Sequence, residues 1–174
     1  MSSSGKNLRY KITVIGDGRV GKTSLISKYT LGAFDTDYVE TIGAQFSKYD
    51  KEIGGDSIRL LLWDIACQDS FDFLGPSFYR ESDAAIIVFS LEENQLGSRS
   101  FNNIINWYQE VNQFCGYIPI VLFANKVDLI NEDEIDHPKI QKIVKKNKFL
   151  SYYITSTKTG QGVHNAFDTI IENL

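Results

Sequence analysis

The sequence predicts an α/β fold: a mostly parallel six-stranded sheet with one antiparallel edge hairpin and helices on both faces. Three observations support this prediction. Short apolar runs alternate along the chain with longer segments of helical periodicity, which is typical of parallel α/β proteins. Two of the runs, 84–90 and 119–125, are apolar almost throughout, as strands buried on both faces are. The pair Gly54-Gly55 separates two further strand-like runs and indicates a tight hairpin turn.

The predicted elements follow one another in a regular order. Residues 9–15 form the first strand, and a glycine-rich turn leads from it into a helix at 22–31. Between strands 84–90 and 119–125, apolar side chains recur at helical spacing and predict one helix over 98–114. The remaining elements are a hairpin of strands at 44–53 and 57–64, a helix at 139–148, a strand at 149–154 and a helix at 163–173.

Length and composition favour one globular domain. The chain has 174 residues, of which 43% are hydrophobic and 23% are charged. We expect residues 1–7 to be a flexible lead-in and 8–174 to be a single domain. The formal net charge of −4 argues against a nucleic-acid-binding surface, which normally shows a basic excess. No apolar run reaches the roughly 18 residues that a membrane-spanning helix requires.

The few cysteines and histidines predict neither a disulfide framework nor a metal site. Cys67 and Cys115 are isolated in the sequence, and His137 and His164 lack a ligand partner at metal-binding spacing. Because disulfides mark oxidising compartments, this pattern favours the cytoplasm.

A phosphate-binding loop is predicted at 16–23. The sequence GDGRVGKT fits G-x-x-x-x-G-K-[ST] and stands between a predicted strand and a predicted helix. Glycines let the backbone N–H groups turn towards phosphate oxygens; Lys22 would reach the β- and γ-phosphates, and the Thr23 hydroxyl would bind Mg²⁺. The alternative is a glycine-rich turn that merely connects a strand to a helix. The nucleotide-binding residues predicted here are Gly16, Asp17, Gly18, Arg19, Val20, Gly21, Lys22, Thr23 and Ser24.

A polar loop after strand 119–125 predicts which base is bound. A carboxylate at Asp128 would accept two N–H bonds from the guanine edge and would be mismatched on adenine. The stem of Lys126 can lie over a base, and Asn125 can tie this loop to the phosphate loop. Taken alone, the four residues NKVD are also compatible with an ordinary polar turn. The predicted base-site residues are Asn125, Lys126, Asp128, Leu129 and, through backbone amides meeting the guanine O6, Ser156, Thr157 and Lys158.

These motifs in this order, together with Thr41 and the segment 64–68, resemble the small GTPases of the Ras superfamily. The resemblance covers residues 8–174. Within the superfamily, TIGAQF at 41–46, WD at 63–64 and FYR at 78–80 are similar to the Rab family. The resemblance implies a three-layer P-loop G domain that binds GTP or GDP with Mg²⁺ and serves as a molecular switch in vesicle trafficking.

The resemblance also implies roles for individual residues. The implied metal ligands are Thr23, Thr41 and Asp64. The implied catalytic residues are Gln68, which would orient the attacking water, with Lys22 and Thr41. Further implied contacts to the nucleotide come from Tyr38, from Cys67 and from Phe34, which would cover the base or ribose edge unless it is a plain core aromatic.

The stretch WDIACQD at 63–69 departs from the family pattern at Ile65 and Cys67, where threonine and glycine are usual. Cysteine keeps the backbone N–H donor but costs about 1–2 kcal/mol where a turn needs a left-handed angle. We therefore expect GTP binding with slow or partner-dependent hydrolysis. Gly18, by contrast, favours some catalytic activity, because glycine leaves space beside Gln68. The alternative is a hydrolysis-deficient regulatory or scaffold G domain; a small-molecule kinase would leave the base-binding loops unexplained.

Three aromatic side chains are expected to form an effector surface, with interior filling as the alternative: Phe46, Trp63 and Phe78. The resemblance implies effectors, an exchange factor and a GTPase-activating protein as partners of a monomeric protein that does not bind nucleic acid. Rab-like proteins usually end in a lipidated tail, whereas the last residues here, IENL, contain no cysteine. Membrane contact is therefore expected only through an absent tail or a longer parent protein, at the cytosolic face of vesicles or endomembranes.

Overall fold

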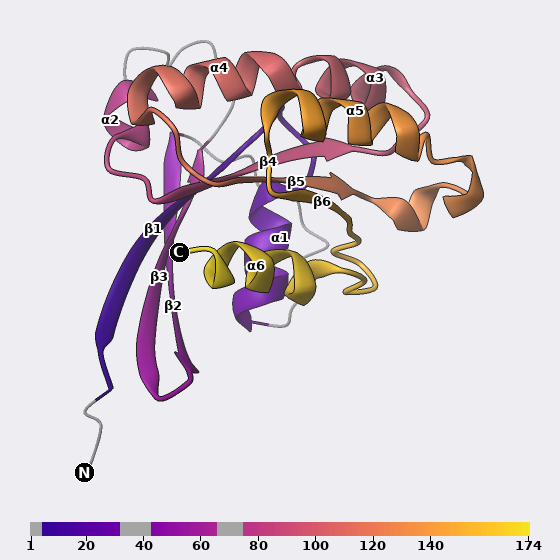
Figure 1. The fold of residues 1–174 in the computed structure, drawn as a ribbon. Coiled ribbons are helices and arrows are strands. Elements are labelled where there is room, and N and C mark those ends of the chain that lie inside the picture. The colour runs from indigo at the N-terminus through magenta and orange to yellow at the C-terminus, as the bar shows by residue number, and fades with distance from the viewer. Residues whose placement is uncertain (1–4, 32–42, 66–74) are drawn as a thin grey trace.

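The computed structural model describes residues 5–31, 43–65 and 75–174. Its centre is a six-stranded sheet with the strand order β2-β3-β1-β4-β5-β6 (Figure 1). The strands are β1 (Asn7–Ile15), β2 (Ala44–Ile53), β3 (Asp56–Ile65), β4 (Ala84–Ser90), β5 (Ile120–Asn125) and β6 (Ser151–Ile154). Among these strands, β2 and β3 pair antiparallel and all other neighbours pair parallel. The predicted α/β class and the edge hairpin are confirmed.

Helices cover both faces of the sheet. One face carries α1 (Lys22–Leu31) and α6 (Val163–Glu172), and the other carries α2 (Gly75–Tyr79), α3 (Gln95–Asn102), α4 (Ile104–Cys115) and α5 (His137–Asn147). In Figure 1, α3, α4 and α5 lie above the sheet and α6 lies below it. Each helix layer closes an apolar core of its own against the sheet. Three layers result, as the sequence predicts.

β4 shows why both helix layers are needed. All of its residues are buried. Alternate side chains of a strand point to opposite faces, so β4 contributes to both cores. The side chains in the core with α1 and α6 are Ala84, Ile86 and Val88, and those in the opposite core are Ala85, Ile87 and Phe89. A strand without a polar face is stable only between two apolar layers.

The hairpin turn lies where the sequence places it. Ile53 pairs with Asp56 across a two-residue turn. Gly54 and Gly55 both have positive φ, 60° and 91°, a conformation that glycine adopts without a steric penalty. Two such angles in succession define the turn that matches the natural twist of a hairpin.

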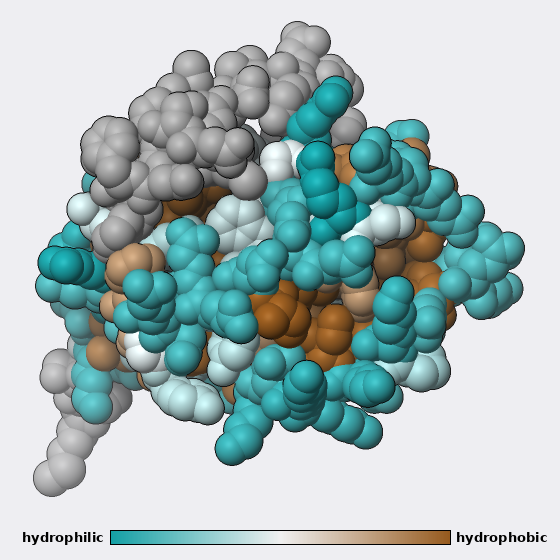
Figure 2. All heavy atoms as spheres, turned by 90° about the horizontal axis from the view of Figure 1, so that it is seen from above, coloured by the Kyte–Doolittle hydropathy of each residue, from teal (hydrophilic) through white to brown (hydrophobic). Residues whose placement is uncertain are grey.

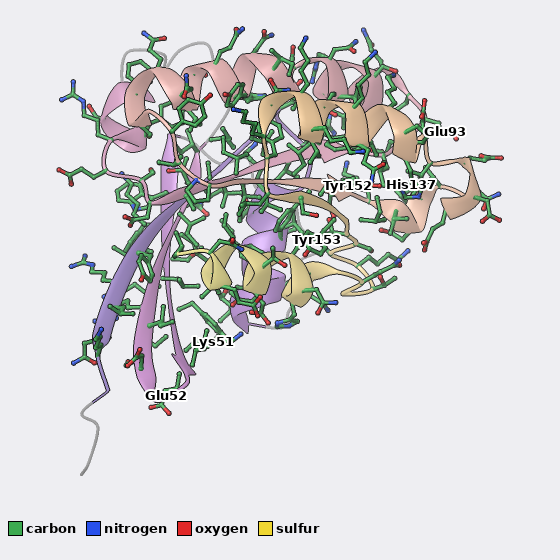
Figure 3. All side chains as sticks on the ribbon, in the orientation of Figure 1. Lys51, Glu52, Glu93, His137, Tyr152 and Tyr153 are labelled. Atoms are coloured by element: carbon green, nitrogen blue, oxygen red, sulfur yellow. The ribbon has the colours of Figure 1, made fainter. Side chains whose placement is uncertain are left out.

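The far end of the hairpin is held by two polar contacts. Lys51 Nζ lies 2.5 Å from Asp168 Oδ1 on α6, and Figure 3 labels Lys51 below this helix, towards the lower end of the hairpin. At the first residue of β3, the Asp56 side chain accepts a hydrogen bond at Oδ1 from the backbone N–H of Lys6, at 2.7 Å. β1 begins directly after Lys6, at Asn7, inside the segment expected to be a lead-in.

The helix predicted over 98–114 is two helices, so this prediction is wrong in detail. α3 begins earlier than expected, because the Asn94 side chain caps its first turn. The helices separate at Asn103, where the backbone has the turn-like angles φ −79° and ψ −7°. The Asn103 side chain donates to the Asp17 carboxylate in the phosphate loop. This tertiary contact coincides with the break between the helices. The spacing of apolar residues does not reveal the break, because it reflects only one face of a helix.

Other boundaries also differ from the prediction. α5 begins two residues earlier, since Asp136 caps it by accepting a hydrogen bond from the Lys139 N–H at 3.0 Å. β6 begins at Ser151 rather than 149, because the N–H of Phe149 bonds back to the Val144 carbonyl at the end of α5. α2 was not predicted, since five residues are too short to show periodicity.

The surface is mixed in character. Figure 2 shows the molecule from above, where hydrophilic side chains cover most of the visible face and hydrophobic side chains appear in smaller areas between them. Within the described residues, no helix is both long enough and apolar enough to cross a membrane.

Candidate functional site

The candidate site lies at the carboxyl end of β1, between β3 and β4. From β1 the chain turns to α1 on one face of the sheet, and from β4 it turns to α3 on the other. In open α/β sheets, ligands bind beyond the strand ends at the point where the connections diverge in this way. The phosphate loop and the base loop predicted from the sequence both start at this edge.

Two glycines of the phosphate loop have neighbours so close that no side chain fits, and both have positive φ. At Gly16, with φ 139°, an added Cβ would lie 2.1 Å from the Val88 carbonyl oxygen. At Gly21, with φ 101°, it would lie 2.4 Å from Asn125 Nδ2. At Gly18 no described atom lies within 4 Å of such a Cβ. The loop is therefore packed tightly against β4 and β5 at both ends and is open at its middle.

Lys22 is directed into the loop. Its side chain is buried, and Nζ donates to the carbonyl oxygens of Gly16 at 2.8 Å and Asp17 at 2.9 Å. The helix α1 begins at this residue, so the positive end of the helix adds to the lysine charge. The loop thus concentrates positive potential where a phosphate would be cradled.

Two side chains with oxygen atoms that could bind a metal ion, Thr23 and Asp64, contact each other at this site. The Thr23 hydroxyl donates to Asp64 Oδ2, although the two residues are 41 positions apart in sequence. Asp64 is only 2% exposed and is placed by the parallel pairing of β3 with β1, where it lies opposite Val14. A hydroxyl and a carboxylate are hard oxygen donors of the kind that Mg²⁺ prefers. These two predicted metal ligands are adjacent, and their donor chemistry fits that ion.

The base loop is joined to the phosphate loop through Asn125. This side chain is fully buried, and its Nδ2 donates to the Val20 carbonyl oxygen at 2.9 Å. Its Oδ1 accepts a hydrogen bond from the Thr155 hydroxyl at 3.1 Å. The predicted link between the two loops is present, and the loop after β6 is joined to it as well.

Lys126 and Asp128 are each held by a side chain from another loop. Lys126 has the left-handed angles φ 70° and ψ 35°, and its Nζ lies 2.6 Å from Glu92 Oε2. Asp128, in the short 3₁₀ helix η2 (Val127–Leu129), accepts a hydrogen bond from the Ser156 hydroxyl at 2.6 Å. Strained backbone at a non-glycine residue such as Lys126 is frequent at binding sites.

Glu92 is a site residue that sequence reasoning missed. Burial by itself would raise the pKa of this carboxyl, but hydrogen bonds from Lys126 and Ser90 outweigh that effect and lower it. The residue lies two positions after the end of β4, at the same sheet edge as the motifs. Its position after a buried strand was the only signal in the sequence.

The loop after β6 differs from the prediction in one respect. The backbone N–H of Ser156, expected to be available to the base, donates to the Gln161 carbonyl oxygen at 3.0 Å. Ser156 and Thr157 are nevertheless buried at the site, and Lys158 follows them at the surface. Leu129 lies beside the base loop and is 55% exposed.

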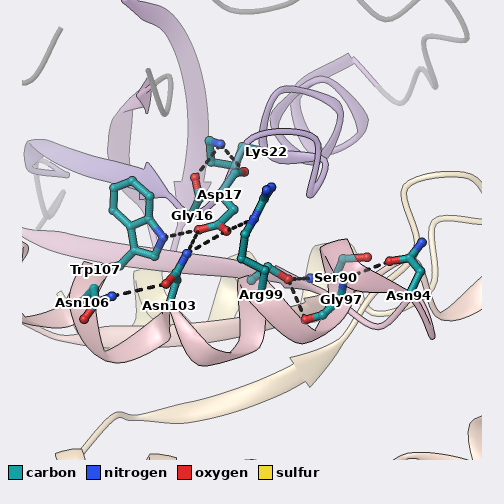
Figure 4. A network of polar contacts seen from close by, with 11 residues as sticks. Gly16, Asp17, Lys22, Ser90, Asn94, Gly97, Arg99, Asn103, Asn106 and Trp107 are labelled. Carbon is teal, nitrogen blue, oxygen red and sulfur yellow. Dashed lines mark hydrogen bonds and ion pairs between the residues drawn. The ribbon is translucent and has the colours of Figure 1, made fainter. Parts of the chain in front are cut away.

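Asp17 separates the roles of its side chain and its backbone. Its carboxylate points away from Lys22 towards α3 and α4 (Figure 4), so any contact of Asp17 with a nucleotide stays a prediction for its backbone alone. It accepts hydrogen bonds from Arg99, Asn103 and Trp107. An open pocket of about 470 Å³ adjoins these side chains, and no residue of the base loop lines it. The pocket therefore borders the phosphate loop, at Asp17 and Gly18, on the side of α3 and α4.

The predicted aromatic cluster is present. The Phe46 and Trp63 rings face each other across β2 and β3 with centroids 5.4 Å apart, and the Trp63 and Phe78 centroids are 6.1 Å apart. Lys11 Nζ lies 4.8 Å from the Trp63 ring centroid. Phe46 is 45% exposed, so interior filling does not account for it.

Several predicted site residues lie outside the described part of the chain: Phe34, Tyr38, Thr41, Cys67 and Gln68. Ile65, one of the two departures from the family pattern, is the last residue of β3. It is 6% exposed and packs in the core formed with α2, α4 and α5. Its apolar side chain is thus part of the folded interior.

Fold and site together define a three-layer P-loop G domain, with the phosphate and base loops joined at one sheet edge. Residues 11–174 match the model of the Ras family. The chain is 33% identical to Ras-related protein Rab-9A of Homo sapiens, over 98% of this chain and 85% of that protein. Identity is 34% to Rab-9B of Mus musculus, with the same coverage, and 31% to Rab-21 of Bos taurus, over 95% and 73%. The chain belongs to the Ras family and is a Rab-like small GTPase.

Proposed function

We propose that this chain is a molecular switch that binds GTP and GDP with Mg²⁺ and hydrolyses GTP slowly. One observation carries the proposal: the hydrogen bond from Asn125 to Val20 joins the phosphate loop to the base loop. A single nucleotide can therefore contact both loops at once. A phosphate-binding loop alone would favour no base, and a base loop alone would not require a triphosphate.

The phosphate loop holds the phosphates through its backbone N–H groups and Lys22. Thr23 and Asp64, with Thr41 from outside the described residues, would hold Mg²⁺. Bound at this position, the ion would offset negative charge on the phosphates. Arg19 and Ser24 flank the loop at its open side and at the start of α1.

Asp128 selects guanine by accepting two of its N–H groups, and the hydroxyl of Ser156 orients this carboxylate. The stem of Lys126 covers the base while Glu92 restrains its ammonium group. Backbone amides of Thr157 and Lys158 complete the site, with Leu129, Phe34 and Tyr38 around the nucleotide edge.

Hydrolysis depends on Gln68, which orients the attacking water, and it is slow because of Cys67. The test is Cys67→Gly, which restores the residue usual in the family. We expect faster single-turnover GTP hydrolysis and a higher ratio of GTP to GDP affinity than in the parent. If neither quantity changes, Cys67 does not control the switch. If neither protein hydrolyses GTP at all, the domain is the hydrolysis-deficient regulatory or scaffold alternative.

Trafficking is the process in which we place this switch, by analogy with the Rab proteins that it resembles. Its partners would be effectors, an exchange factor and a GTPase-activating protein, and the protein itself would be a monomer. It would act in the cytoplasm at the cytosolic face of vesicles or endomembranes. Membrane contact would come from a lipidated tail or from a longer parent protein.

The aromatic cluster of Phe46, Trp63 and Phe78 is the effector surface in this proposal. Trp63 lies at the end of β3 that leads into the segment of Cys67 and Gln68. We therefore expect its fluorescence to differ between GDP and a non-hydrolysable GTP analogue. Subtracting the spectra of Trp63→Phe isolates its signal from that of the other tryptophan, Trp107. Identical spectra for the two nucleotides would show that this surface does not report the nucleotide state.

The most direct test of the whole proposal is the nucleotide content of the purified protein. We expect bound guanine nucleotide at close to one per chain, lost when Mg²⁺ is chelated. Titration with ATP serves as the control, since Asp128 disfavours adenine. Binding of ATP as tight as that of GTP would overturn the guanine assignment.

A further inference from the structure

The Asp17 carboxylate is held by three donors, from α3, from α4 and from Asn103 between the two helices. Its Oδ1 accepts from Trp107 Nε1 at 2.9 Å and from Asn103 Nδ2 at 3.1 Å. Its Oδ2 accepts from Asn103 Nδ2 at 2.9 Å and from Arg99 Nε at 3.1 Å. We call Asp17, Arg99, Asn103 and Trp107 the Asp17 clamp, and Figure 4 shows its dashed contacts.

These hydrogen bonds compensate the negative charge of a buried carboxylate. Asp17 is 3% exposed, and a buried carboxylate is costly unless it is paired and fully hydrogen-bonded. It also lies within a loop that binds phosphate, so a carboxylate turned inward would repel the ligand. The clamp satisfies the carboxylate and keeps it directed away from the phosphate cradle.

The backbone of the same residue faces the other way. The Asp17 carbonyl oxygen accepts a hydrogen bond from Lys22 Nζ at 2.9 Å, beside the similar bond to the Gly16 carbonyl. One residue therefore joins the α3–α4 layer, through its side chain, to the phosphate-binding lysine, through its backbone. Movement of the side chain would move the carbonyl that orients Lys22.

We propose that Asp17 is a positioning residue, and that the clamp sets the phosphate loop and Lys22 in the geometry that binds the β-phosphate. This inference rests on the proposed guanine-nucleotide site. It assigns Asp17 no contact with the nucleotide through its side chain; the effect passes through Lys22.

The members of the clamp contribute unequally. The Arg99 side chain is 57% exposed and borders the open pocket, so its ion pair is screened by solvent. Asn103 and Trp107 are partly buried and donate bonds of 2.9 Å to the carboxylate. The loss of Asn103 or Trp107 as a donor should therefore weaken nucleotide binding more than replacement of Arg99.

The test compares GDP with GMP, which lacks the β-phosphate. The clamp variants are Asp17→Asn, which places an N–H₂ among donors, Asn103→Ala, and Trp107→Phe, which keeps a ring and removes the N–H. We expect each to weaken GDP binding about tenfold, as lost hydrogen bonds to a charged group do. GMP affinity, measured by competition, should stay within about twofold. The dissociation constant for GMP divided by that for GDP should therefore be smaller in these variants than in the parent.

The matched control is Asn102→Ala, since this neighbouring asparagine has an exposed side chain. It should leave the affinity for both nucleotides unchanged. Arg99→Lys retains the charge and should weaken GDP binding less than Trp107→Phe. Because the clamp acts as a unit, the double variant Asp17→Asn with Trp107→Phe should bind GDP about as weakly as Asp17→Asn alone.

Each other outcome is decisive. Equal losses of GDP and GMP affinity would mean that the clamp only stabilises the fold, and unchanged GDP affinity in all three variants would mean that it positions nothing. Both results overturn the inference and leave the proposed function intact. A parent protein that binds neither nucleotide overturns the proposed function itself.

Discussion

Asn125 Nδ2 donates a hydrogen bond to the Val20 carbonyl oxygen at 2.9 Å, across 105 positions of sequence. The bond is fully buried, and the second end of the same side chain is occupied by Thr155. The geometry of the nucleotide site therefore depends on one amide that contacts both loops.

Replacing Asn125 should weaken the link between the two loops and speed the release of bound nucleotide. In Asn125→Ala both hydrogen bonds are lost, and we expect GDP release to accelerate about tenfold or more. Thr155→Val keeps the side-chain shape and removes only the hydroxyl donor, so its effect should be smaller. The measurement is the dissociation rate of a fluorescent GDP analogue. A release rate for Asn125→Ala equal to that of the parent would contradict this role.

Two glycines of the phosphate loop should respond differently to alanine. Gly16→Ala places a methyl group 2.1 Å from the Val88 carbonyl oxygen at φ 139°, where the neighbouring atom is backbone and cannot move aside. We expect a loss of at least about 2 kcal/mol in the free energy of unfolding. Gly18→Ala meets no described atom within 4 Å and should change stability by less than about 0.5 kcal/mol. Denaturant unfolding measures both, and equal effects would refute the packing argument.

The pair of Glu92 and Lys126 should make stability depend on acidic pH. The pKa of Glu92 is lowered in the folded protein: burial opposes this, and hydrogen bonds from Lys126 and Ser90 outweigh it. A lowered pKa contributes stability that is complete above the ordinary value of 4.5 and is lost as pH falls through the lowered value. Glu92→Gln should flatten the dependence of unfolding on pH below about 4.5.

The control for this experiment is the adjacent Glu93→Gln, whose side chain is exposed and is labelled in Figure 3. Its unfolding profile should follow that of the parent. If Glu92→Gln and the parent lose stability in parallel below this pH, the ion pair with Lys126 does not contribute to the acid transition.

The ionisation of Tyr29 should make the free energy of unfolding depend on alkaline pH. Tyr29 is 2% exposed and stacks on Phe167 with ring centroids 4.2 Å apart; burial first, and then the nearby Asp168 carboxylate, raises its pKa. In the unfolded chain this hydroxyl ionises near its ordinary value of 10, whereas in the folded protein it stays neutral. Stability is therefore complete below about pH 10 and falls above it, by up to about 1.4 kcal/mol per pH unit.

Tyr29→Phe should remove this alkaline loss, and the measurement is urea unfolding between about pH 9 and 11. Tyr117→Phe is the control, because Tyr117 is 80% exposed. An alkaline loss that persists unchanged in Tyr29→Phe would show that another group causes it.

The sequence by itself determined the elements whose signals are local. The phosphate loop occupies eight consecutive positions, and its glycines, Lys22 and Thr23 follow from the backbone chemistry of those positions alone. The almost entirely apolar run of β4 predicts a strand covered on both faces. Gly54-Gly55 predicts the hairpin, because its turn needs φ angles that glycine adopts most readily. The family resemblance rests on the same local motifs.

Only the tertiary structure decided where separated side chains meet. The donors to Asp17 follow it by 82 to 90 positions, and nothing near Asp17 in the sequence indicates them. The same contact divides the expected helix at Asn103, and Glu92 became a site residue only because β4 and β5 are neighbours. A buried charge must take its partners from wherever the fold brings them, whereas turns and strand periods are set by adjacent residues.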